Sequence, residues 1–235
     1  MGTSKGYIPP TNQKWKNAKR AIYAIGKNGY SRSKVQQAVK KYAEAYGETH
    51  LGTSSVSTVA GNVLSFLSDI NKIGFANAIV KHGLGEFENL KGIELYNALL
   101  NYFASNVNTL DNQIVRDSLG DTLDKLQVDE LRDLEAVNSQ QFLMIFIAEF
   151  VVKGFEECFA EKLIEHMEDL SKYDEIIKDV EQIVEERIYV DQAIKNILGL
   201  DFRTNEGQEY ITKMINDAFN TLKQMEVIGI EDMDQ

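Results

Sequence analysis

Proline is confined to the first ten residues of this 235-residue chain, where it occurs as Pro9 and Pro10. A proline inside a helix removes a backbone hydrogen bond and clashes with the preceding turn, so a long stretch without proline can be helical throughout. Tandem proline itself favours an extended, polyproline-like segment. We therefore expect residues 1–12 to form an extended, flexible N-terminal tail, and helices wherever the later apolar spacing permits them.

Apolar residues recur at three- and four-residue spacing along most of the chain after the tail, which is the pattern of amphipathic helices. No alternating runs joined by tight turns indicate strands. The most apolar segment, Gln140 to about Leu170, is expected at the centre of a bundle. We predict an all-α, multi-helix, bundle-like domain of roughly eight to ten helices. Its inward-facing residues should include Trp15, Ala18, Ile22, Val35, Ala38, Val39, Tyr42, Tyr46, Val59, Val63, Phe66, Leu67, Ile70, Ile93, Tyr96, Leu99, Leu100, Phe103, Leu110, Ile114, Leu119, Leu123, Leu126, Ile176, Ile177, Val180, Ile183, Val184, Ile188, Ile211, Met214, Ile215, Phe219 and Leu222.

Small polar residues mark the expected helix starts, because their side chains satisfy the first free backbone N–H groups. The predicted caps are Thr11 or Asn12, Ser31 or Ser33, Asn138 or Ser139, and Asn205 with Gln208 as a capping box. Gly52-Thr53-Ser54-Ser55 is predicted to be a turn before a helix. A short helix is predicted at 75–81, ended by His82-Gly83.

The length suits one large domain or two small, closely packed ones. We expect a single α-helical domain over residues 13–230, with a possible internal boundary near 128–139. Residues 231–235 should form an acidic C-terminal tail.

Charge is distributed unevenly along the chain. The net charge of −11 argues against broad nucleic-acid binding, yet residues 1–50 hold ten Lys or Arg and two Glu, giving +8 and leaving −19 for the rest. Such asymmetry indicates either an interaction surface or basic helices packed near acidic helices of the same chain. The sequence leaves both interpretations open.

Cys158 is the only cysteine, so no disulfide can form within the chain, which fits a reducing compartment. The first ten residues lack the apolar core of a secretory signal. The longest apolar run, Phe142–Ala148, is far shorter than the roughly 18 residues that a membrane span requires. We expect a cytoplasmic protein with no membrane partner.

Candidate catalytic groups do not assemble into a known pattern. Of the three histidines (His50, His82 and His166), His50 and His82 lie at predicted helix ends, where they can meet terminal carbonyl groups. No nucleophile-elbow motif is present. Gly83-Leu84-Gly85 lacks the third glycine and the preceding strand of a dinucleotide-binding loop.

Five glutamates of the central segment invite a carboxylate metal site, but a ferritin-like site also needs Glu-x-x-His, which is missing. A solvated acidic face is the favoured interpretation of Glu149, Glu156, Glu157, Glu161 and Glu165. We expect no catalytic residue, no metal ligand and no cofactor, and hence no enzyme.

The first residues read Met1-Gly2-Thr3-Ser4. A small second residue permits removal of Met1, which would expose the Gly2 α-amine. That amine has a reference pKa of about 8 and is partly neutral and nucleophilic at pH 7. The myristoylation pattern fails because position 6 is Gly6. Glycine at position 2 is common, so this feature alone does not identify a function.

Several segments spread over most of the chain resemble the QatB family of bacterial anti-phage Qat systems. The most specific internal match is Leu51-Gly52-Thr53-Ser54-Ser55 followed by Gly61-Asn62-Val63-Leu64-Ser65-Phe66-Leu67-Ser68-Asp69. The other matching segments are Met1-Gly2-Thr3-Ser4, Ala18-Lys19-Arg20, Ser31-Arg32-Ser33, Val39-Lys40-Lys41-Tyr42, and Ile114-Val115-Arg116-Asp117 before Leu123. Family members often carry a longer proline-rich stretch, which is reduced here to Ile8-Pro9-Pro10.

The resemblance implies a role in antiviral defence beside an ATPase (QatA), a QueC-like enzyme (QatC) and a TatD-like nuclease (QatD). It further implies that the QueC-like enzyme attaches a 7-deazaguanine group, as a 7-amido-7-deazaguanine, to the amine of Gly2. Thr3 and Ser4 would be read by the enzyme's groove, and Pro9 and Pro10 would hold the tail off the helical body.

Three other functions are compatible with the sequence. The chain could be a helical scaffold or adaptor that docks a defence ATPase without N-terminal modification. It could be an enzyme with an unrecognised site. It could bind nucleic acid through the basic residues 1–50, in which case affinity would fall with salt.

Overall fold

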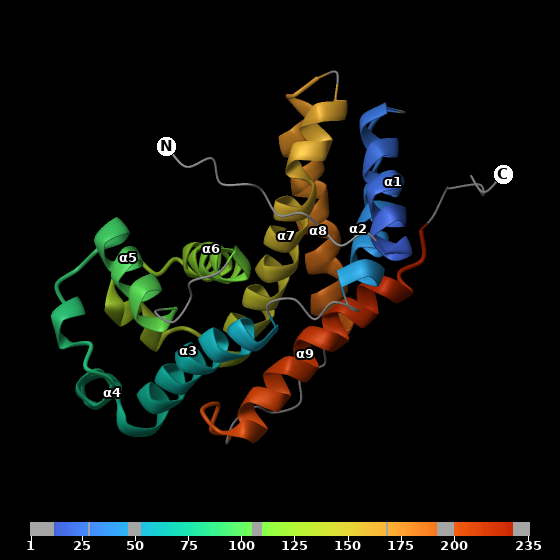
Figure 1. The fold of residues 1–235 in the computed structure, drawn as a ribbon. Coiled ribbons are helices and arrows are strands. Elements are labelled where there is room, and N and C mark those ends of the chain that lie inside the picture. The colour runs from blue at the N-terminus through green and yellow to red at the C-terminus, as the bar shows by residue number, and fades with distance from the viewer. Residues whose placement is uncertain are drawn as a thin grey trace. The chain divides into compact units, whose positions relative to one another are not determined.

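A computed structural model of the chain describes residues 12–27, 29–46, 53–104, 110–167, 169–191 and 200–227. Within these ranges the chain forms helices and no strand (Figure 1), so the all-α prediction is confirmed. Lys91 and Glu130 form one isolated β-bridge. The α-helices are α1 (Gln13–Lys27), α2 (Arg32–Tyr46), α3 (Thr53–Ile73), α4 (Phe75–His82), α5 (Gly92–Phe103), α6 (Leu110–Lys125), α7 (Ser139–His166), α8 (Lys172–Asp191) and α9 (Asn205–Gln224), with short 3-10 helices η1 (Gly85–Phe87) and η2 (Leu131–Glu135).

The chain divides into two compact units. Unit 1 comprises Met1–Leu51, Val151–Gln192 and Asn216–Gln235, and unit 2 comprises Gly52–Phe150 and Ala193–Ile215. Helices α7 and α9 each contribute residues to both units. The single domain over 13–230 and its internal boundary near 128–139 stay predictions. The predicted tails lie outside the described residues, apart from Asn12.

An aromatic cluster forms the core of unit 1. The ring of Tyr42 on α2 meets Trp15 of α1 at a centroid distance of 6.3 Å, and it meets the rings of Phe155, Phe159 and Phe219 at 5.6–6.1 Å. Most of these contacts are edge-to-face, the geometry that the ring quadrupoles favour. Because the tyrosine and its four neighbours are all buried, they tie α1 and α2 to the parts of α7 and α9 in this unit.

In unit 2, α3 supplies one continuous buried face, and the predicted stripe Val59, Val63, Phe66, Leu67 and Ile70 is confirmed. The short helix α4 ends as predicted, because Gly83 adopts a left-handed conformation (φ 67°) that glycine reaches without strain. Its N–H returns to the carbonyl groups of Ile79 and Val80.

Most caps were predicted correctly. The side chain of Asn12 accepts from the N–H of Trp15 at 3.0 Å, and Asn138 accepts from Gln140 at 2.9 Å. The cap of α9 was placed one residue too late: Thr204 caps the helix through the N–H of Gly207. The side chain of Gln208 instead donates to the carbonyl of Phe202 at 2.8 Å.

Two further predictions were wrong. Thr53-Ser54-Ser55 belongs to the first turn of α3 and is not a separate turn. Ile93 is 71% exposed, whereas Leu95 two residues later is fully buried.

Gly26 lies in the last turn of α1, where a Cβ would crowd His166 of α7. The glycine is thus used for close helix packing.

Candidate functional site

The residues predicted for modification and partner recognition lie outside the described residues. These are Gly2, Thr3, Ser4, Pro9 and Pro10. Their roles stay predictions. Among the described residues, a candidate site lies in unit 2.

A polar pocket of about 410 Å³ lies within unit 2. Three helices and the turn before α9 supply its lining, which contains three basic side chains and three neutral polar ones. The lining residues are Asn62 and Ser65 of α3, Lys81 and His82 of α4, Tyr102 of α5, and Arg203. Ligand-binding pockets span roughly 300–1,000 Å³, so this one has room for a small molecule.

One buried carboxylate organises the basic side of the pocket. Asp69 of α3 is 9% exposed in its side chain, and its two oxygens accept from Lys81 Nζ and His82 Nε2, each at 2.8 Å. A guanidinium nitrogen of Arg203 lies 3.9 Å from the same carboxylate. Burial by itself raises the pKa of Asp69, but the hydrogen bonds and charges of Lys81 and His82 outweigh it and leave that pKa lowered.

The C-terminal end of α4 places His82 beside this carboxylate. His82 is the last residue of α4, as predicted, but its Nε2 binds Asp69 instead of meeting the helix's terminal carbonyls. The ring of Phe66 packs edge-on against it at 5.1 Å. Tyr102 donates its hydroxyl to the carbonyl oxygen of His82 at 2.7 Å, and burial raises the pKa of Tyr102. Asp69 and Phe66 therefore hold the imidazole, and Tyr102 holds the backbone of the same residue.

Arg203 is presented by a tight turn. The side chain of Asp201 accepts from the backbone N–H of Arg203 at 3.1 Å, and this bond is the main reason that the pKa of Asp201 is lowered. The turn packs closely on two glycines: a Cβ at Gly61 would crowd the carbonyl of Phe202, and one at Gly207 would meet the backbone of 201–202. The absence of side chains at these glycines lets the turn reach α3.

The sequence contains a signal for this pocket that corresponds to no known motif. Asn62, Ser65 and Asp69 follow one another at i, i+3 and i+7, so they share one face of α3 amid buried apolar residues. Asp69 and Ser65 are buried, and a buried polar stripe on an apolar helix needs partners. All three lie in the segment that resembles the QatB family most specifically.

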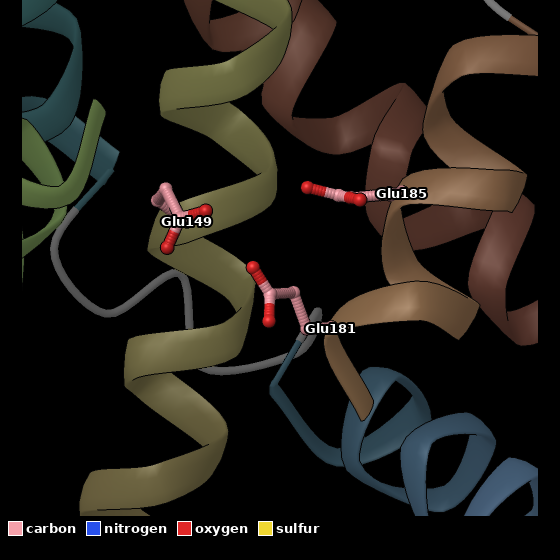
Figure 2. A group of neighbouring side chains, drawn as sticks. All are labelled: Glu149, Glu181 and Glu185. Atoms are coloured by element: carbon pink, nitrogen blue, oxygen red, sulfur yellow. The ribbon is translucent and has the colours of Figure 1, made fainter. Parts of the chain in front are cut away.

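The acidic face predicted for the central helix is only partly correct. Glu157, Glu161 and Glu165 are exposed, but Glu149 is buried and lies 2.5 Å from Lys125. Figure 2 shows Glu149 on α7 and two glutamates on α8, Glu181 and Glu185. Glu149 belongs to unit 2 and the α8 pair to unit 1. Cys158 is buried, as expected of a small core residue.

A second ionic cluster lies in unit 1. The guanidinium of Arg32 on α2 binds the carboxylate of Glu186 through one nitrogen at 3.0 Å, and its other nitrogen lies 3.0 Å from Gln182 and 3.4 Å from Asp179, all on α8. Tyr30 donates to Asp179 at 2.6 Å. Here a basic segment does pack on an acidic helix of the same chain, as one interpretation of the charge asymmetry required.

No helix among the described residues has both the length and the apolar character needed to cross a membrane. A family model described as "QatB: Qat anti-phage system associated protein QatB" matches residues 49–222, which is more than half of the chain. Searches of curated proteins and of solved structures find no match. The matched range contains every residue that lines the pocket and excludes the N-terminal tail.

Proposed function

Because the chain belongs to the QatB family of Qat anti-phage system associated proteins, we propose that it is the protein substrate of a QueC-like enzyme. In this proposal Met1 is removed and a 7-amido-7-deazaguanine group is attached to Gly2. The chain supplies the amine and the recognition sequence, and it contributes no catalytic residue or cofactor of its own. The observation that carries the proposal is the unhindered start Met1-Gly2-Thr3-Ser4.

The chemistry suits an N-terminal glycine. ATP activates the carboxylate of the deazaguanine on the partner enzyme, the neutral Gly2 amine attacks the carboxyl carbon, and an amide forms as the activating group leaves and the amine loses a proton. A reference pKa of about 8 leaves part of the amine neutral at pH 7. Glycine adds no side chain to block the attack. Thr3 and Ser4 then enter the enzyme's groove as extended backbone.

The proposal extends to a wider assembly. A cytoplasmic QatC-like enzyme would modify the chain, and the helical body would dock a QatA-like ATPase and a TatD-like nuclease. In the alternative function the helical body docks the ATPase and the tail is dispensable. Deletion of residues 2–10 separates the two, because only a scaffold would keep its defence activity.

Intact-mass spectrometry of the chain coexpressed with its QueC-like partner tests the proposal directly. We expect loss of Met1 and a mass gain located on Gly2 by peptide sequencing. Gly2→Val should abolish the gain, because the bulkier residue hinders both Met1 removal and attack by the amine. Gly6→Ala is the matched control and should be modified like the wild type.

An unmodified Gly2 in the presence of a demonstrably active partner would overturn the proposal. So would equal modification of Gly2→Val. The helical content measured by circular dichroism should be the same in both variants, since both positions precede α1, the first helix among the described residues.

A further inference from the structure

We propose that the pocket of unit 2 binds a small phosphomonoester of sugar-phosphate size, with Arg203 and Lys81 holding the phosphate beside His82. This inference does not rest on the modification of Gly2. It rests on the sign of the charges that line the pocket, on the placement of Asp69 behind them, and on the neutral polar groups of the same lining.

The lining is basic. Lys81, His82 and Arg203 come from two different parts of unit 2, and no acidic side chain occurs among the described residues that line the pocket. Arginine offers a planar fork of donors, and lysine a mobile point charge, and the two together form the usual protein ligands of phosphate. The pocket therefore favours an anion over a neutral or cationic ligand.

Asp69 orients these groups without filling the pocket. Its side chain is only 9% exposed, whereas those of Lys81 and Arg203 are 44% and 50% exposed. Lys81 and Arg203 each have several donors. Lys81 uses one on Asp69, and Arg203 lies near both Asp69 and Asp201, so further donors remain for a ligand. A carboxylate held behind the basic groups pre-orients them, which lowers the entropic cost of binding.

The neutral part of the lining suits a hydroxylated body. The amide nitrogen of Asn62 donates to the carbonyl of Phe103 at 3.1 Å, so the side-chain oxygen of Asn62 is the part of the amide that can accept from a ligand. The hydroxyl of Tyr102 donates to His82, which leaves its lone pairs as acceptors. Ser65 adds a further hydroxyl. A lining that combines these acceptors with cations matches a polyol that carries one phosphate.

The volume of the pocket also suits a small phosphomonoester. About 410 Å³ exceeds the space that a bare phosphate occupies and lies in the range of small-molecule sites. Ribose 5-phosphate is therefore a suitable probe, and ribose is its uncharged counterpart. Inorganic phosphate tests the anionic end alone.

Isothermal titration calorimetry of the full-length chain with these three probes is the test. We expect ribose 5-phosphate to bind more tightly than inorganic phosphate, and ribose not to bind. The imidazole carbon-bound proton signal of His82, assigned by its loss in His82→Gln, should shift in NMR spectra on addition of ribose 5-phosphate.

Arg203→Met and Lys81→Met should each weaken binding of ribose 5-phosphate by about tenfold or more, the scale of a lost charge-assisted hydrogen bond. Lys213→Met is the matched control, since Lys213 is an exposed cation of α9 in the same unit and does not line the pocket. Its binding should be unchanged.

Three results would overturn the proposal. The first is no heat and no His82 shift with ribose 5-phosphate in the wild type. The second is equal weakening by Lys213→Met and Arg203→Met, which would indicate diffuse charge attraction. The third is unchanged binding in both pocket variants, which would place any binding elsewhere.

Discussion

The two ionic clusters of this protein contain similar groups in opposite arrangements. In unit 1 one cation, Arg32, is surrounded by acceptors of α8. In unit 2 one anion, Asp69, is surrounded by three basic side chains that line a pocket. The charge of the central group decides whether hydrogen-bond donors and positive charge remain available for a ligand in each cluster.

A guanidinium has five donors, and the Arg32 cluster spends several of them on two carboxylates and an amide. This arrangement joins two helices and offers no surplus positive charge. The Asp69 carboxylate cannot satisfy every donor of a lysine, a histidine and an arginine. The first cluster is therefore structural, and the second combines a structural role with the capacity to bind an anion.

Replacement of Asp69 should have the larger effect on stability. Asp69→Asn leaves the neighbouring basic groups without their anion, and we expect the free energy of unfolding to fall by about 2–3 kcal/mol at pH 7. Denaturant titration followed by circular dichroism measures the loss. Asp201→Asn is the control, because Asp201 is 54% exposed and should lose clearly less.

The pH dependence of that difference follows from the lowered pKa of Asp69. A carboxyl group whose folded pKa is lowered contributes stability above its unfolded value of about 3.9, and loses it as pH falls through the folded value. The gap between wild type and Asp69→Asn should thus be full at pH 7 and shrink in acid. A gap that stays constant to low pH would show that charge is not its cause.

Helix positions were predictable because they depend on local spacing. The short helix α4 and its glycine terminus followed from the residues 75–83 alone. Ile93 was misplaced because it lies in the first turn of α5, where several positions satisfy the same three- and four-residue spacing and only packing selects Leu95. Local patterns therefore predicted where the helices lie better than which face of each helix is buried.

The pocket was not predictable in the same way. Asp69 meets His82 thirteen residues later, and Arg203 more than a hundred residues later. Neither separation forms a motif, since the contacts depend on how α3, α4 and the turn before α9 pack. What the sequence did contain was the polar face Asn62, Ser65 and Asp69 on a helix otherwise suited to the core.

Replacement of Arg32 should have the smaller effect on stability. The side chain of Arg32 is 40% exposed, and exposed ion pairs contribute little because water screens them. We expect Arg32→Met to lower the free energy of unfolding by about 1 kcal/mol, and high salt to shrink the difference. Denaturant titration at two salt concentrations measures both. A loss as large as that of Asp69→Asn would erase the contrast between the clusters.

The smallest expected effect is spectroscopic and concerns Tyr30 beside Arg32. The hydrogen bond to Asp179, then burial, and the negative charges of Asp179 and Glu175 raise the pKa of Tyr30 to about 12. A tyrosine whose folded pKa is raised contributes stability below its unfolded value of about 10 and loses it as pH rises through about 12.

The phenolate absorbance of Tyr30 is identified by its loss in Tyr30→Phe. In the wild type this absorbance should therefore appear only near pH 12. Asp179→Asn should move it toward pH 10, and an unchanged titration would mean that Asp179 does not hold the phenol. In that case the Arg32 cluster would be looser than its geometry indicates, and less distinct from the Asp69 pocket.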